Sequence, residues 1–144
     1  MRVSLWIEVN SYLSSKMASP STKITFDEFQ DYVSQALEAL PENIREMMVN
    51  VAITVAEHPT TAQKQAVGLG RGHALYGLYQ GVPLTARSAH YGMITPDRIT
   101  IFMHPMVSHF TTPETIKSQI QKTVLHEIGH HFGMNEKQLR ELGY

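Results

Sequence analysis

The sequence predicts a single α+β domain in which helices are combined with a small sheet. Residues 25–40 and 112–132 carry apolar side chains at helical spacing, and two apolar, alternating stretches typical of strands lie between them. The length of 144 residues fits one domain. Residues 1–23 follow no period and end in a Ser- and Pro-rich stretch. We therefore expect a flexible lead-in over residues 1–23 and the domain over residues 24–144.

The composition excludes several classes of protein. The chain has 12 Lys and Arg against 13 Asp and Glu, so its charge gives no indication of a nucleic-acid or membrane-surface partner. It has no Cys, which excludes a disulfide scaffold, a thiol nucleophile and a thiolate zinc site. No apolar run approaches the roughly 18 residues of a membrane span, and the first residues lack the apolar core of a secretory signal. We expect a cytoplasmic protein that binds neither nucleic acid nor membrane.

The first helix is predicted from the way it begins and ends. Thr25 and Glu28 form a capping box, in which the hydroxyl accepts from a first-turn amide and the carboxylate reaches back. Apolar residues then recur at helical spacing as far as Leu40, and Pro41 stops the helix. Because proline suits the first position of a helix, residues 41–48 predict one or two further helical turns.

Strands are predicted after this helix. Residues 49–56 place Val or Ile at every second position, which favours a half-buried strand, and Pro59 closes it. We interpret residues 59–72 as a loop whose glycines, in the string GLGRG, serve a flexible connector and not a phosphate cradle.

The stretch that follows predicts the rest of the sheet. Residues 75–88 favour two short strand pieces that are broken at Gly81 and Pro83. The string RITIFM is a further strand candidate, and we expect the strand Arg98–Met103 to lie at the edge of the sheet.

The last helix has the clearest boundaries. Thr112 suits the N-cap, Pro113 the first helical position, and Glu114 the positive end of the helix. We expect the helix to run to about Phe132 and to end at Gly133, the usual residue for a left-handed cap.

Within that helix lies an HExxH string, residues 126–130. His126 and His130 are one turn apart, about 6 Å along the axis and about 40° around it, so both imidazoles can converge on one cation. Glu127 lies about 100° from His126, which suits contact with a metal-bound water better than a place among the ligands. Gly129 lies beside the histidine face, where a side chain would crowd a cleft.

A hydrolytic zinc ion uses three protein ligands and one open position. The string HEIGHHFGMNE has the spacing HExxHxxGxxE, and Gly133 lets the chain turn so that Glu136 can reach the metal from the side. Glu141 and the terminal carboxylate of Tyr144 are the alternatives downstream. His131 lies about 140° from His126 and is expected to be structural or solvated. Two imidazoles and a carboxylate suit one Zn²⁺ best, with Mn²⁺, Co²⁺ or Ni²⁺ as alternatives.

Several segments of the sequence resemble a known family. The strings HEIGHHFGMNE and TVLHEIGHHFG look like the small bacterial zincin-like metallopeptidases, also called minimal zincins, and so do FDEFQDYVSQALEALPENI, NVAITVAEHP and LYGLYQGVPLT. The resemblance covers about residues 24–144. It implies that His126, His130 and Glu136 would be the metal ligands and Glu127 the catalytic carboxylate. It also implies an N-terminal helix and a C-terminal active-site helix packed on a small mixed sheet.

The expected function is therefore zinc-dependent hydrolysis of peptide bonds in a peptide or protein substrate. The metal would activate water and polarise the carbonyl, Glu127 would act as general base, and the edge strand could hold the peptide by strand addition. Tyr91, His104 and His109 are candidates for stabilising the oxyanion. The alternatives are a non-catalytic metal-binding or protein-interaction module that keeps the zincin shell, and a hydrolase of non-peptide amides. The oligomeric state is left open.

Overall fold

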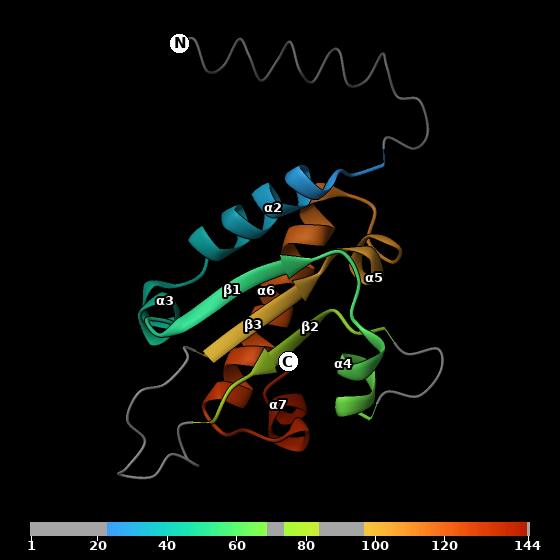
Figure 1. Cartoon of the computed structure of the whole chain (residues 1–144). Helices are drawn as coiled ribbons and strands as arrows, with labels where there is room; N and C mark the ends of the chain where they lie inside the picture. Colours follow the sequence, from blue (N-terminus) through green and yellow to red (C-terminus); the bar gives the residue numbers. More distant parts are fainter. Residues whose placement is uncertain (1–22, 69–73, 84–96, 144) are drawn as a thin grey trace, which may run out of the picture.

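The structure, a computed structural model, describes residues 23–68, 74–83 and 97–143. It has two layers, a three-stranded sheet and helices that cover one face of it (Figure 1). The strands, in spatial order, are β1 (Val51–Ala56), β3 (Asp97–Phe102) and β2 (Gly77–Gln80). β1 runs parallel to β3 and β2 runs antiparallel to it. This mixed sheet with its helices confirms the predicted α+β class.

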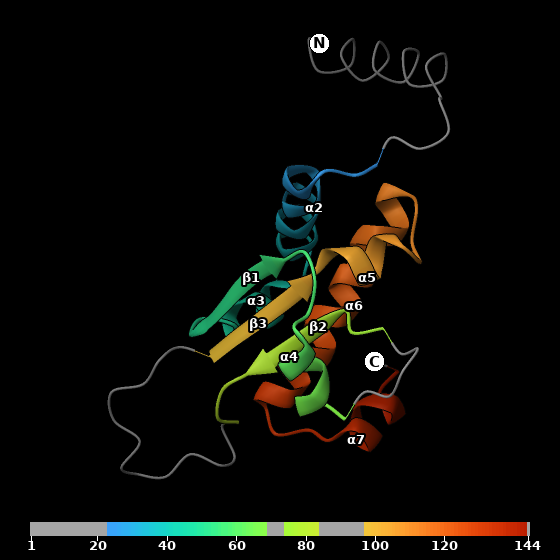
Figure 2. The same ribbon diagram turned by 45° about the vertical axis from the view of Figure 1, so that its right-hand side comes forward.

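Two long helices lie on the same side of the sheet. α6 (Pro113–His131) contacts β2 and β3 directly, and α2 (Phe26–Glu38) packs on α6. α6 runs behind the strands in the views of both Figure 1 and Figure 2. The shorter helices are α3 (Glu42–Met47), α4 (Thr61–Ala66), α5 (Met103–Val107) and α7 (Glu136–Glu141). None of the helices within the described ranges is both long enough and apolar enough to cross a membrane.

The core fixes α6 against the sheet. Its side chains come from α2, from β3 and from the sheet-facing side of α6, and include Phe29, Val33, Ile99, Ile101, Ile116, Ile120, Val124 and Ile128. Each fully buried side chain of this size contributes about 1.5–3 kcal/mol of burial free energy. The packing therefore holds the other side of α6, which carries His126 and His130, at a defined position relative to the sheet.

The predicted helix ends are confirmed. Thr25 and Glu28 form the capping box of α2, and the Thr112 hydroxyl accepts from the amide of Thr115 at the start of α6. After α6 the chain turns at Gly133, whose φ of +84° is in the left-handed region that glycine adopts without strain. The Gly133 amide donates to the carbonyl of His130 at 2.9 Å, which closes the turn.

Strand β3 corrects one expectation, since it is the central strand and not the edge. Ile99, Thr100, Ile101 and Phe102 are all buried, as expected of a strand that is paired on both sides. The edge strand next to the histidine face of α6 is therefore β2.

Two further expectations are corrected along the chain. Residues 59–72 are not all loop, because α4 begins at a capping box formed by Thr60 and Gln63. Of the two strand pieces predicted within residues 75–88, the first is β2, and the second lies outside the described residues, as does the lead-in except for Lys23.

Gly129 also has a different reason from the one expected. A Cβ atom at this position would collide with the side chain of Leu139, whose Cγ would lie 3.3 Å away, with the Sδ atom of Met134 at 3.5 Å. Leu139 belongs to α7 and is 1 % exposed. The glycine therefore lets α7 dock onto α6; the clash is with that helix and not with a ligand in the cleft.

Candidate metal centre

The three side chains expected to bind a metal lie together in space. Each of His126, His130 and Glu136 offers one donor atom, and these three atoms lie within 4.8 Å of one another. The Glu136 Oε1 atom is 3.3 Å from His126 Nε2 and 2.9 Å from His130 Nε2. Glu141, the alternative third ligand, instead lies 4.0 Å from Lys137 on the exposed side of α7.

The short helix α7 brings Glu136 to the histidines. After the turn at Gly133, Asn135 caps α7, and its side chain accepts from the amide of Gln138 at 2.9 Å. The Gln138 side chain accepts from the Asn135 amide in return, which makes a capping box. Glu136 is thus the first residue of a helix that starts immediately beyond the end of α6, and the fold of this segment places its carboxylate.

The hydrogen bond of one histidine sets the direction of its free lone pair. His130 Nδ1 lies 3.0 Å from the carbonyl oxygen of Met134. A carbonyl can only accept, so Nδ1 carries the hydrogen, and the neutral ring keeps its lone pair at Nε2. That nitrogen faces the Glu136 Oε1 atom at 2.9 Å, so the two atoms can serve as ligands of one cation.

The donor set fits the metal that the resemblance implies. Two imidazole nitrogens and one carboxylate oxygen are the ligands of catalytic zinc sites, and an outer-shell bond from a histidine to a carbonyl is a recurrent feature of such sites. Burial acts to raise the pKa of Glu136, but the charges of His126 and His130 and the hydrogen bonds from them outweigh it and lower that pKa. The carboxylate is thus ionised, as a metal ligand must be.

Glu127 occupies a different environment from Glu136. It lies on the side of α6 that faces β2, is only 8 % exposed, and its Oε2 atom accepts a hydrogen bond of 2.8 Å from the backbone amide of Tyr79. Burial raises the pKa of Glu127, against the opposing effects of His130, His126 and the Tyr79 amide. A buried carboxyl of this kind can hold and release a proton nearer to neutral pH than an exposed glutamate can.

Because the pKa of Glu127 is raised, we expect this residue to make the metal-free protein less stable as pH rises. Since the folded state favours the protonated form, the stability that Glu127 contributes is fully present below its unfolded pKa and is lost as pH rises through its folded pKa. We expect metal-free Glu127→Gln to melt at a higher temperature than the metal-free wild type at pH 8, with a smaller difference at pH 4.5. Thermal unfolding monitored by circular dichroism at both pH values measures this, and an equal difference at the two would contradict it.

A cavity opens beside these side chains. It has a volume of about 710 Å³, and its walls include Glu127, His130 and Glu136 on one side and β2 residues such as Leu78 and Tyr79 on the other. A volume of this order suits a bound ligand or a short stretch of peptide.

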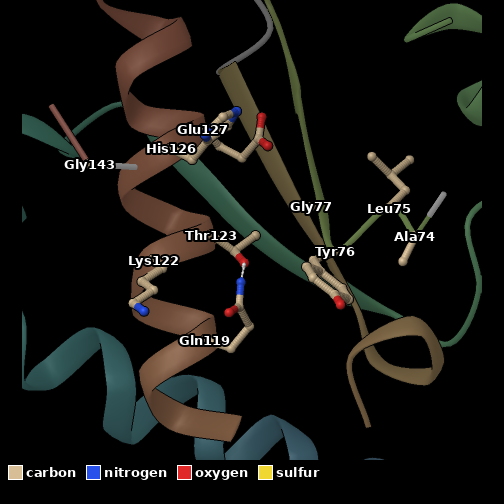
Figure 3. Close-up of a pocket in the computed structure, with 10 residues that line it drawn as sticks. All are labelled: Ala74, Leu75, Tyr76, Gly77, Gln119, Lys122, Thr123, His126, Glu127 and Gly143. Carbon is tan, nitrogen blue, oxygen red and sulfur yellow. Dashed lines mark hydrogen bonds between the residues drawn. The ribbon is translucent and has the colours of Figure 1, made fainter. Parts of the chain in front are cut away.

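A second, smaller hollow lies next to this cavity along α6. It has a volume of about 290 Å³ and shares His126 and Glu127 with the larger cavity. Figure 3 shows Thr123 and Gln119, joined by a hydrogen bond of 3.3 Å, on the α6 side of this hollow and Tyr76 across from them. The two hollows together form a cleft between α6 and β2, with Glu127 between its two parts.

Gly77 explains how β2 comes so close to α6. A Cβ atom at residue 77 would lie 2.5 Å from Thr123 Cγ2 and 3.4 Å from Glu127 Cγ. No side chain fits there, so the glycine allows the edge strand to approach Glu127. Nothing in the sequence marks this role, because it depends on contacts with residues 46 and 50 positions further along the chain.

His131, His104 and His109 do not belong to the donor group. His131 is buried and contacts Asp97 and Tyr79, outside the donor group. The ring of His104 stacks on that of His58 at 4.1 Å, and His109 Nδ1 lies 2.6 Å from the Tyr76 hydroxyl. Neither His104 nor His109 lines the two hollows of the cleft, and Tyr91 lies outside the described residues.

Comparison with known proteins agrees with the geometry. Residues 48–144 match the family described as zincin-like metallopeptidase, a match that takes in the whole sheet, α6 and every donor. Among individual curated proteins there is no significant match. With two thirds of its length matched and the expected donor group in place, the chain belongs to the zincin-like metallopeptidase family.

Proposed function

We propose that this protein is a zinc-dependent metallopeptidase that hydrolyses peptide bonds in a peptide or protein substrate in the cytoplasm. The observation that supports this most strongly is the position of Glu127. A buried carboxylate lies next to a group of two imidazoles and one carboxylate, all of them on the wall of one open cavity. A site that only stored a metal would need the three donors but not the neighbouring acid.

His126, His130 and Glu136 would hold the zinc ion. When bound, zinc lowers the pKa of water and polarises a carbonyl oxygen. Three protein ligands leave a coordination position open for this chemistry. The hydrogen bond from His130 Nδ1 to the Met134 carbonyl would keep that imidazole in the orientation that binding requires.

Glu127 would move the proton. Its Oε2 atom accepts from the Tyr79 amide, which fixes the plane of the carboxylate and leaves Oε1 as the oxygen that takes a proton from the attacking water. The same carboxyl would then pass that proton to the leaving nitrogen of the substrate. The raised pKa of Glu127 suits both transfers, because the acid that forms is stable within the buried site.

Strand β2 takes over the substrate-binding role that was expected of residues 98–103. It is the edge strand beside α6, and Leu78 and Tyr79 line the cavity that holds the donors. An extended peptide that lay along β2 would bring one of its carbonyl groups between Glu127 and the donor group.

Metal removal tests the proposal directly. We expect the purified chain to contain about one zinc ion and to cleave members of a degenerate peptide library. Cleavage should stop after dialysis against a chelator and return with Zn²⁺ but not with Mg²⁺, which prefers oxygen ligands. Elemental analysis and mass spectrometry of the library measure both properties. Stoichiometric zinc without cleavage of any peptide would favour a non-catalytic metal-binding module instead.

A further inference from the structure

A buried polar cluster lies behind the edge strand, next to Glu127 but outside the donor group. Asp97, the first residue of β3, is 2 % exposed, and its Oδ2 atom accepts a hydrogen bond of 2.8 Å from the Tyr79 hydroxyl. His131, which is 4 % exposed, contacts the same oxygen through its Nδ1 atom. One carboxylate oxygen therefore joins the central strand, the edge strand and the last turn of α6.

Gly81 leaves room for this cluster because it has no side chain. A Cβ atom at Gly81 would lie 2.6 Å from Asp97 Cγ and 2.9 Å from the Tyr79 hydroxyl oxygen. These atoms belong to a short side chain and a rigid ring that are already hydrogen-bonded to each other, so they cannot easily move aside. The glycine thus keeps open the space in which the Asp97 carboxylate and the Tyr79 hydroxyl meet.

Tyr79 links the cluster to the candidate active site. Its side chain is held by Asp97, and its backbone amide donates to Glu127 Oε2 at 2.8 Å. On the helix side, His131 follows His130 directly and is the last residue of α6. Any shift of β2 relative to α6 would change the Tyr79–Glu127 bond and the Tyr79–Asp97–His131 contacts together.

We propose that Asp97 and His131 are positioning residues, which hold Tyr79 so that its amide stays on Glu127 Oε2. Neither residue belongs to the donor group or to the lining of the cavity, and both reach the Glu127 carboxylate through Tyr79. The catalytic part of this inference rests on the proposed function. The structural part, which is the link from the cluster to the Tyr79 amide, does not depend on the proposed function.

Native-state hydrogen exchange of the metal-free protein tests the link. Tyr79→Phe removes only the hydroxyl and keeps the ring and the amide. We expect the amide of residue 79 to exchange at least tenfold faster, while the Phe102 amide, which donates to the Tyr76 carbonyl at 2.9 Å, keeps its rate. Asp97→Asn should have the same effect, and the double variant should add nothing to the larger single effect, because both changes break one connection.

Metal affinity and steady-state kinetics separate positioning from other roles. In Tyr79→Phe, zinc affinity should stay at the wild-type value because the donors are unchanged. The value of kcat should fall about tenfold at unchanged KM, because Glu127 is misplaced and substrate contacts remain. Thr54→Val is the matched control: it removes a part-buried hydroxyl that lies 3.1 Å from the Thr100 hydroxyl in the same sheet. It should leave both amides and kcat unchanged.

Failure of this proposal and failure of the proposed function would give different results. Wild-type exchange of the residue 79 amide in both Tyr79→Phe and Asp97→Asn would overturn the proposal, as would equal acceleration of the residue 79 and Phe102 amides, which indicates general loosening of the sheet. If the wild type cleaves no peptide but the selective acceleration is found, the proposed function fails and the link between cluster and Glu127 stands.

Discussion

Glu127→Gln is expected to lower kcat by about 10²–10⁴-fold, the usual contribution of a general base, while the protein keeps its full zinc content. Glutamine has the shape of glutamate and can still accept the hydrogen bond from the Tyr79 amide. It cannot take up a proton at neutral pH. Steady-state kinetics on a cleaved peptide, with elemental analysis of the same sample, measure the two quantities.

Glu141→Gln is the control for this change. Glu141 is an exposed carboxylate of α7 whose ion-pair partner is Lys137, and it belongs neither to the donor group nor to the cleft. This variant should cleave at the wild-type rate. Equal rates for Glu127→Gln and the wild type would remove Glu127 from the role of general base, even if the donors bind zinc.

His126→Ala is expected to abolish stoichiometric zinc binding and with it all cleavage. The loss of a ligand should weaken zinc affinity by more than the roughly 10–100-fold that the loss of an outer-shell partner costs. The His126 side chain is 26 % exposed, so its removal opens no sealed cavity in the core and the fold should persist. Competition with a chromophoric chelator measures the affinity, and circular dichroism follows the fold.

His104→Ala is the matched control for the histidine. His104 is an exposed residue that stacks on His58 and lies outside the donor group, so its zinc affinity should equal that of the wild type. Unchanged affinity in His126→Ala would show that the donor set is wrong. Loss of helical signal in His126→Ala would instead indicate that the histidine face of α6 stabilises the fold.

The sequence predicts those parts of the fold whose signals are local. The capping box at Thr25 and the turn at Gly133 each depend on residues within one helical turn, and both helix ends are found where they are expected. The same kind of signal, Thr60 with Gln63, could have identified α4. It is easily missed because α4 buries no side chain and so shows no apolar period.

The order of the strands is not predictable in this way. β3 pairs with β1 on one side, where Asp97 lies opposite Val51, and with β2 on the other. These contacts join distant parts of the chain, and the alternation within a strand carries no information about its neighbours. The run from Ile99 to Phe102, in which every residue is β-branched or aromatic, is the cue that favours a buried central strand.

Some residues of the candidate site are close together in the sequence and others come from distant strands. His126, His130 and Glu136 belong to one short motif, whose spacing alone indicates that they converge. The partners of Glu127 and His131 come from β2 and β3, and no pattern within those strands marks Tyr79 or Asp97. The groups that would perform the chemistry are thus marked in the sequence, whereas the groups that hold them in place are not.

The closeness of the three donors along the chain has a thermodynamic consequence. Residues 126–136 contain all of them, so the denatured polypeptide retains a complete chelating segment closed by a short loop. An ion that binds both the native and the denatured ensemble raises the melting temperature by less than its native affinity alone would give. Saturation with zinc should therefore raise the melting temperature of this protein by less than the native-state affinity alone predicts.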